Sequence, residues 1–140
     1  MTDIQAALGL SQLKRLEEFV NRRNQLARRY DNELEILPVR KQKMPQGIQS
    51  SNHLYIIRVP NQMHHSLFEK LRRSGIGVNL HYIPVHLQPY YRKLGFQEDD
   101  FPEAEAYGSE AISLPLYPDL NDEHQDYVIE TLKQNIHDQR

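Results

Sequence analysis

The side chains best suited to chemistry gather in thirteen consecutive residues, Asn79–Tyr91, with the sequence NLHYIPVHLQPYY. This stretch holds two His, three Tyr, one Asn and one Gln, together with two Pro. Imidazole and phenol groups hydrogen-bond to phosphates or sugar hydroxyls, and aromatic rings offer flat apolar contacts. From this chemistry alone two interpretations remain open, a ligand-binding segment or a cluster of buried tyrosines.

Seven histidines raise the question of a metal site. His64 and His65 are neighbours on an expected helix, so their rings point in different directions. His81 and His86 have no nearby pair of carboxylates that would complete a ligand set. The chain also has no cysteine, which excludes a thiolate zinc site, a cysteine nucleophile and a disulfide scaffold. The sequence therefore predicts no metal.

Composition narrows the function classes further. The chain has 140 residues, the size of one domain, with 17 Lys+Arg against 19 Asp+Glu. This balance argues against a nucleic-acid binder, whose surface would carry a basic excess. No apolar run approaches the roughly 18 residues that span a bilayer, and the N-terminus lacks a signal-peptide pattern. We expect a cytoplasmic protein with no membrane and no nucleic-acid partner.

A long helix is expected to open the chain, over residues 1–37. Thr2 and Gln5 form a capping-box pattern, and Pro38 bounds the element. Apolar residues follow at steps of mostly three or four, which is typical of a helix that packs on one face. They are Ile4, Leu8, Leu13, Leu16, Val20, Ala27, Tyr30 and Leu34. A helix of this length would project beyond a small domain.

The remaining residues, 38–140, are expected to form a small α+β domain. After a loop over residues 38–51, strands are predicted at 53–59, 76–82 and 112–116, the last interrupted by Pro115. Helices are predicted at 62–73, after Pro89, from Pro102, and at 122–137 with Asn121 as the N-cap. The predicted fold class is α+β, a small and mainly antiparallel sheet covered by helices. The candidate segment Asn79–Tyr91 begins where the second predicted strand ends, and strand ends leading into loops are common places for sites.

Three segments, in order, resemble one known family. They are MTDIQAALGL with Gln12-Leu13 at the N-terminus, His81–His86 (HYIPVH) followed by Tyr90-Tyr91, and Ser113–Pro118 (SLPLYP). Together they resemble the C-terminal part of the DegT/DnrJ/StrS family of nucleotide-sugar aminotransferases, which depend on pyridoxal 5′-phosphate (PLP). The similarity is greatest to the UDP-4-amino-4,6-dideoxy-N-acetylhexosamine transaminases of pseudaminic acid synthesis.

The resemblance implies a fold-type I aminotransferase, with PLP held on a lysine of a large N-terminal domain, glutamate as amino donor and a homodimer. The substrate would be a UDP-linked amino sugar or its 4-keto-6-deoxy precursor, used in polysaccharide or glycan biosynthesis. Carried over by position, the substrate-binding candidates are His81, Tyr82, Pro84, Asn79 and His86. Residues Thr2 to Leu13 would form a scaffold and interface helix.

The family's catalytic lysine is expected in the missing N-terminal part. None of the six lysines here stands in the S-x-x-K setting that the resemblance implies. The chain alone is therefore expected to be inert, with no catalytic and no cofactor-binding residue, because PLP chemistry needs the lysine as anchor and proton shuttle. Two alternatives remain open: a non-catalytic module that binds nucleotide sugars, and an interaction module that uses the apolar face of the first helix.

Overall fold

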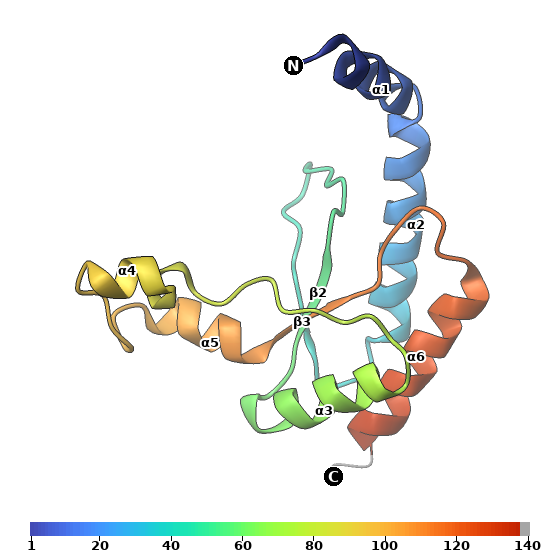
Figure 1. Ribbon diagram of the computed structural model, residues 1–140. Coiled ribbons are helices and arrows are strands. Elements are labelled where there is room, and N and C mark those ends of the chain that lie inside the picture. Colours follow the sequence, from blue (N-terminus) through green and yellow to red (C-terminus); the bar gives the residue numbers. More distant parts are fainter. Residues whose placement is uncertain (138–140) are drawn as a thin grey trace.

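A computed structural model describes residues 1–137 (Figure 1). Its centre is a three-stranded antiparallel sheet in the order β1 (Arg40–Lys41), β2 (Tyr55–Arg58) and β3 (Ala111–Leu114). The strands predicted at 53–59 and 112–116 are confirmed in shorter form, and β3 ends directly before Pro115, as proline requires. With helices packed on this sheet, the α+β class is confirmed.

Three helices build the core around the sheet. They are α2 (Leu16–Glu33), α3 (Asn61–Arg73) and α6 (Asp122–His137), and α6 packs against both of the others. The buried apolar cluster contains side chains of these helices and of the two longer strands. The strand residues in it are Tyr55 and Ile57 of β2 and Ile112 and Leu114 of β3. Its largest fully buried side chains include Tyr30, Ile57, Leu67, Leu71, Ile112 and Leu132.

The single long opening helix was a wrong prediction. The chain forms two helices, α1 (Asp3–Leu13) and α2, separated by a turn at Lys14-Arg15. Figure 1 shows α1 directed away from the line of α2. The predicted capping box of Thr2 and Gln5 is confirmed. The two halves differ because only α2 packs on the core: α1 contains no buried residue, so no tertiary contact holds it in line.

The predicted strand at 76–82 is also wrong. Only Asn79 forms an isolated antiparallel bridge, to Ser113 on the free edge of β3. Ile76 and Val78 do not pair with a strand because their N–H groups are bonded to nearby carbonyls. The Ile76 N–H donates to the Leu71 carbonyl, and the Val78 N–H donates to the Ile76 carbonyl. Ile76 and Val78 are nevertheless buried.

Short helices carry the chain outwards after this bridge. They are a 3₁₀ turn, η1 (Val85–Leu87), then α4 (Pro89–Lys93) and α5 (Pro102–Glu110), which confirms the helices expected after Pro89 and from Pro102. The expected N-cap of α6 is supported by a 2.7 Å hydrogen bond from the His124 N–H to Asn121 Oδ1. None of the helices within residues 1–137 is long and apolar enough to cross a membrane.

Candidate functional site

Two sequence segments that lie far apart in the chain meet at the edge of β3. The backbone N–H of Asn79 donates to the Ser113 carbonyl at 3.2 Å, and the Ser113 N–H donates back at 2.8 Å. This bridge brings the ring of His81 over the Ser113 hydroxyl, with Nδ1 and Oγ 2.8 Å apart. Ser113 was not among the residues predicted to contact substrate. The sheet edge thus fixes the first two candidates, Asn79 and His81.

Two further hydrogen-bonding groups contact His81, the side chains of Asn79 and Tyr107. Nε2 lies 3.5 Å from Asn79 Nδ2, and the same side chain accepts the Leu80 N–H through Oδ1 at 2.8 Å. The His81 carbonyl accepts a 3.4 Å hydrogen bond from the Tyr107 hydroxyl of α5. Both the ring and the backbone of His81 are therefore positioned by neighbours from β3 and α5.

Tyr82 lies next to His81 and faces outwards. Its side chain is 70% exposed, and its ring meets the His81 ring edge-on with the centroids 4.7 Å apart. The peptide bond between the two residues is cis. Tyr90 and Tyr91 are exposed as well, so the interpretation of this segment as a buried tyrosine cluster is wrong.

Pro84 is held against α5. A Cβ atom on Gly108 would lie 2.8 Å from Pro84 Cδ, so only glycine permits this contact. The ring of Pro84 therefore fixes the path of the chain after Tyr82. Whether Pro84 also touches substrate stays a prediction.

His86 is buried in the arm, which we define as residues 82–107. Its Nε2 lies 2.8 Å from Glu105 Oε1, and its ring centroid lies 4.9 Å from that of Phe101. Glu105 also accepts the backbone N–H groups of Asp99 and Phe101. The bond from the Asp99 N–H and then that from His86 lower the pKa of the Glu105 carboxyl. His86 thus ties η1 to α5, and its direct contact with substrate stays a prediction.

Sequence reasoning missed four of these groups, namely Tyr107, Ser113, Glu105 and Gly108. Ser113 opens the SLPLYP segment, which carried the resemblance but was assigned no contact. Glu105 stands in an acidic tract that resembles an ordinary solvated surface. Its partner, His86, lies 19 residues away, and no local pattern signals such a contact.

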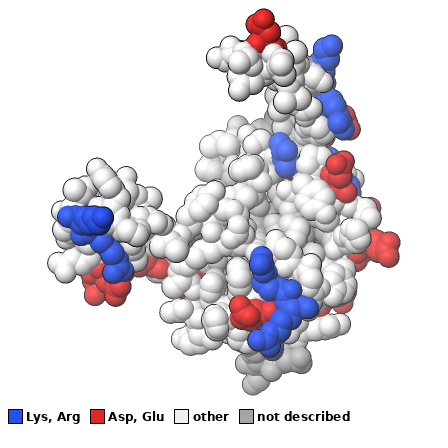
Figure 2. Space-filling view, viewed as in Figure 1, with Lys and Arg blue, Asp and Glu red and all other residues white. Residues whose placement is uncertain are grey.

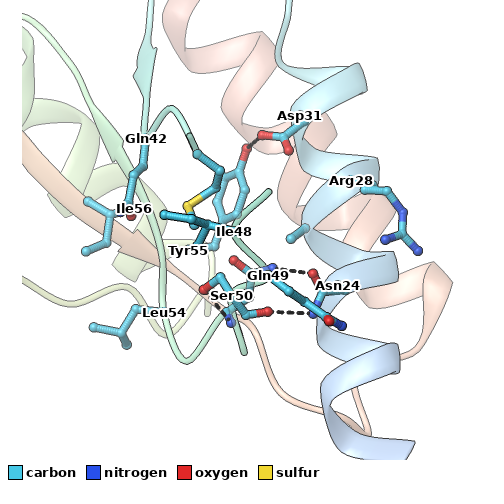
Figure 3. Close-up of a pocket in the computed structure, with 13 residues that line it drawn as sticks. Asn24, Arg28, Asp31, Gln42, Ile48, Gln49, Ser50, Leu54, Tyr55 and Ile56 are labelled. Carbon is cyan, nitrogen blue, oxygen red and sulfur yellow. Dashed lines mark hydrogen bonds between the residues drawn. The ribbon is translucent and has the colours of Figure 1, made fainter. Parts of the chain in front are cut away.

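The described surface also has two hollows, of which the second shares Tyr107 with the residues just described. One, of about 290 Å³, is enclosed by α2 and residues 42–56 (Figure 3). Its walls are joined by hydrogen bonds from the Tyr55 hydroxyl to Asp31 (2.7 Å) and from Asn52 Nδ2 to Asn24 Oδ1 (2.9 Å). Burial, reinforced by Asp31, raises the pKa of Tyr55, so this phenol stays protonated as the donor.

The second hollow, of about 440 Å³, lies over the exposed side of β1 and β2 and is lined by Arg40, Lys41, Arg58 and Tyr107. Glu110 pairs with Arg40 and, at 2.9 Å, with Arg58. These ion pairs neutralise part of the positive charge. Figure 2 shows few charged side chains in the middle of the face between α1 and the arm.

The six lysines of the chain are exposed, half-buried or held by neighbouring groups. Lys14, Lys43 and Lys93 are exposed. Lys41 binds the Asp31 carbonyl and the Glu35 carboxylate, and Lys133 pairs with Glu33 and Glu130. The Glu33 hydrogen bond raises the pKa of Lys133, whereas a Schiff-base lysine needs a lowered pKa. Lys70, the remaining lysine, is half-buried in the basic last turn of α3.

Within residues 1–137 the structure has no group of three or more metal-ligating side chains.

Comparison with known proteins identifies the class. The profile of the DegT/DnrJ/EryC1/StrS aminotransferase family matches residues 1–133, so the chain belongs to that family, as the three sequence segments predicted. Solved relatives share its fold. A putative sugar aminotransferase of Streptococcus pneumoniae, Spr1654, is 37% identical with a TM-score of 0.93 over 99% of this chain. It has been solved in apo, PMP and PLP forms.

Two further relatives extend this comparison. The spore coat polysaccharide biosynthesis protein SpsC of Bacillus subtilis is 38% identical over 95% of the chain. PseC of Helicobacter pylori, an aminotransferase of pseudaminic acid biosynthesis, is 29% identical with a TM-score of 0.88 over 99% of the chain. The chain spans 36% of SpsC and Spr1654 and 38% of PseC.

Proposed function

We propose that this chain is the C-terminal part of a PLP-dependent sugar aminotransferase. The whole enzyme would transfer an amino group, from glutamate, to a 4-keto-6-deoxy nucleotide sugar linked to UDP, and would act as a cytoplasmic homodimer in the biosynthesis of surface polysaccharides or glycans. Family membership and the 36–38% coverage of the relatives support this assignment. PLP, when bound to the whole enzyme, supplies the electron sink for amino transfer.

The contribution of this chain would be recognition of the nucleotide sugar. One observation carries this assignment: His81 is fixed on Ser113 while the ring of Tyr82 beside it is open to solvent. A positioned imidazole next to an exposed aromatic ring can hydrogen-bond to a sugar and also cover an apolar face. Asn79 would complete this surface, and Pro84 and His86 would hold the chain around it.

Saturation-transfer NMR with a UDP-sugar tests the binding role. The parent chain should transfer magnetisation to the sugar, and His81→Ala and Tyr82→Ala, which removes the exposed ring, should reduce the transfer. Tyr127→Ala is the matched control, because this exposed tyrosine of α6 hydrogen-bonds only to the Ser74 carbonyl among the described contacts. No transfer in the folded parent chain would contradict the proposal.

The chain by itself should hold no PLP Schiff base, because five of its six lysines are exposed or ion-paired and the sixth, Lys70, stands in the basic last turn of α3. PLP addition followed by borohydride reduction should give no stoichiometric adduct at a single lysine. Mass spectrometry of the digested product provides the measurement. A single-site, stoichiometric adduct would show that the chain has an anchoring lysine and would refute this part of the proposal.

A protein-interaction module is the second candidate function. It is favoured by α1, whose large apolar side chains are exposed, namely Ile4, Leu8, Leu10 and Leu13. An uncovered face of this kind promotes self-association or binding to a larger body. Light scattering that finds only a monomer at all concentrations would argue against self-association of this chain.

A further inference from the structure

We propose that Asn79 and Ser113 hold His81 in its neutral Nδ1–H form, so that Nε2 accepts a hydrogen bond from a hydroxyl or N–H group of the sugar. His81 would thus recognise the sugar and not the diphosphate of a nucleotide-sugar ligand. This inference rests on the proposed function for its ligand, while the protonation pattern of the ring can be measured without any ligand.

The side-chain amide of Asn79 has a fixed orientation. Its Oδ1 accepts the backbone N–H of Leu80 at 2.8 Å, and only the oxygen of the amide can accept. The Nδ2 group must therefore point the other way, where it lies 3.5 Å from Nε2 of His81. Since Nδ2 is a donor only, a contact with it requires that Nε2 carries a lone pair.

The other ring nitrogen of His81 must then carry the proton. Nδ1 lies 2.8 Å from Ser113 Oγ, a normal distance for an N–H donor and a hydroxyl acceptor. Ser113 is only 4% exposed, and its backbone N–H and carbonyl are both bonded to Asn79. The hydroxyl is therefore held at the Nδ1 edge of the ring. It can accept from Nδ1–H, which agrees with the tautomer that the Asn79 contact selects.

This tautomer selects the chemistry of the ligand. The 3.5 Å contact with Asn79 is long, so it leaves Nε2 open to a closer donor. A phosphate brings acceptor oxygens, which an imidazole lone pair repels, whereas a sugar hydroxyl or acetamido N–H donates. Tyr82 stands beside the His81 ring with its own ring exposed and can cover the apolar face of a sugar.

Long-range ¹H–¹⁵N correlation of the chain labelled in histidine tests the protonation pattern at neutral to mildly alkaline pH. His81 should give a pyrrole-type shift at Nδ1 and a pyridine-type shift at Nε2, the reverse of the form that free neutral histidine favours. His81→Gln assigns the signals among the seven histidines. The ordinary Nε2–H pattern, or two protonated nitrogens, would overturn the proposal.

Two substitutions test the cause of this pattern. Asn79→Asp places a carboxylate oxygen opposite Nε2, so that nitrogen should become protonated. Asn121→Asp, at the N-cap of α6, is the matched control and should leave the His81 signals unchanged. Ser113→Ala removes the acceptor for Nδ1 and should weaken the preference for the Nδ1–H form. An unchanged pattern in both Asn79→Asp and Ser113→Ala would contradict the roles assigned to these residues.

The ligand class is tested with UDP-N-acetylglucosamine and with UDP alone as probes. The sugar-bearing probe should shift the His81 Nε2 signal, and UDP should not. An equal shift with UDP, or no shift of His81 with either probe, would overturn the assignment of the ligand group. The proposed function fails on a different result, the absence of saturation transfer from any part of the chain.

Discussion

The core and its two projections, α1 and the arm, are stabilised in different ways. In the core, a single helix, α6, contributes four buried apolar side chains, Val128, Ile129, Leu132 and Ile136. In the arm, residues 82–107, His86 is the one buried side chain, and exposed apolar side chains remain at Tyr82, Ile83, Val85, Tyr90 and Leu94. The core is held by apolar burial, whereas the arm is held by a few polar contacts, by contacts between aromatic rings and by the close contact of Pro84 with Gly108.

The candidate site lies at the boundary between the core and the arm. His81 lies where the two regions meet, because its ring is fixed by Ser113 of the core sheet and its carbonyl by Tyr107 of the arm. A rigid support on one side and exposed aromatic groups on the other suit a binding surface. The apolar side chains left uncovered on both projections are consistent with further contacts in a larger protein.

The largest difference in the free energy of unfolding is expected between two leucine substitutions, one in the core and one in the arm. Leu132→Ala removes a fully buried side chain of α6 and should lower the free energy of unfolding by about 2–5 kcal/mol. Leu94→Ala changes a side chain of the arm that is 62% exposed and should cost less than about 0.5 kcal/mol. Urea denaturation of the parent chain and of the two variants measures both losses in the free energy of unfolding. Similar losses in the two variants would show that the arm is packed as tightly as the core.

Two glycine-to-alanine substitutions, at Gly108 and at Gly9, compare the stability of the junction between core and arm with that of α1. Gly108→Ala puts a Cβ 2.8 Å from Pro84 Cδ, so we expect overpacking to cost about 1–3 kcal/mol despite the better helix propensity of alanine. Gly9→Ala, in α1, meets no atom within 4 Å and should increase the helicity of α1. Denaturation and circular dichroism check these outcomes. A stabilising Gly108→Ala would mean that Pro84 moves freely from α5.

Sequence patterns correctly predicted two kinds of element. The first kind is stabilised by contacts between residues that are close in the chain, and the second is a helix whose apolar residues recur on the face that is buried in the structure. Among the elements predicted in this way are the helix at 122–137 (α6) and the helix from Pro102 (α5). The break at Lys14-Arg15 could not be predicted, because the apolar stripe continues through it although only the α2 half is covered. His81 was predicted as a site residue, but its partner Ser113 lies 32 residues away, and only the fold joins them.

Two helix caps provide a smaller test of the same contrast. Asn121→Ala removes the cap of α6 and should lower the free energy of unfolding by about 1 kcal/mol, because α6 is part of the core. Thr2→Ala breaks the capping box of α1, which buries nothing. It should reduce the helical content of α1 and leave the main unfolding transition unchanged, since an isolated helix of this length is marginal in water. A shift of that transition by Thr2→Ala would show that α1 is coupled to the core.

The smallest effect is expected from the polar contact within the arm, through Glu105→Gln. The Asp99 N–H and His86 lower the pKa of Glu105 in the folded chain, so its charged form contributes stability above the ordinary carboxyl pKa of about 4.3. This contribution is lost as the pH falls through the lowered folded pKa. The parent chain should therefore exceed Glu105→Gln in stability at neutral pH, and the difference should shrink in acid. Solvent screens the partly exposed carboxylate, so the difference should stay below that of the α6 cap. Chemical denaturation of both proteins across this pH range measures the difference, and one that grows in acid would contradict the assigned role of the Glu105 carboxylate in holding the arm.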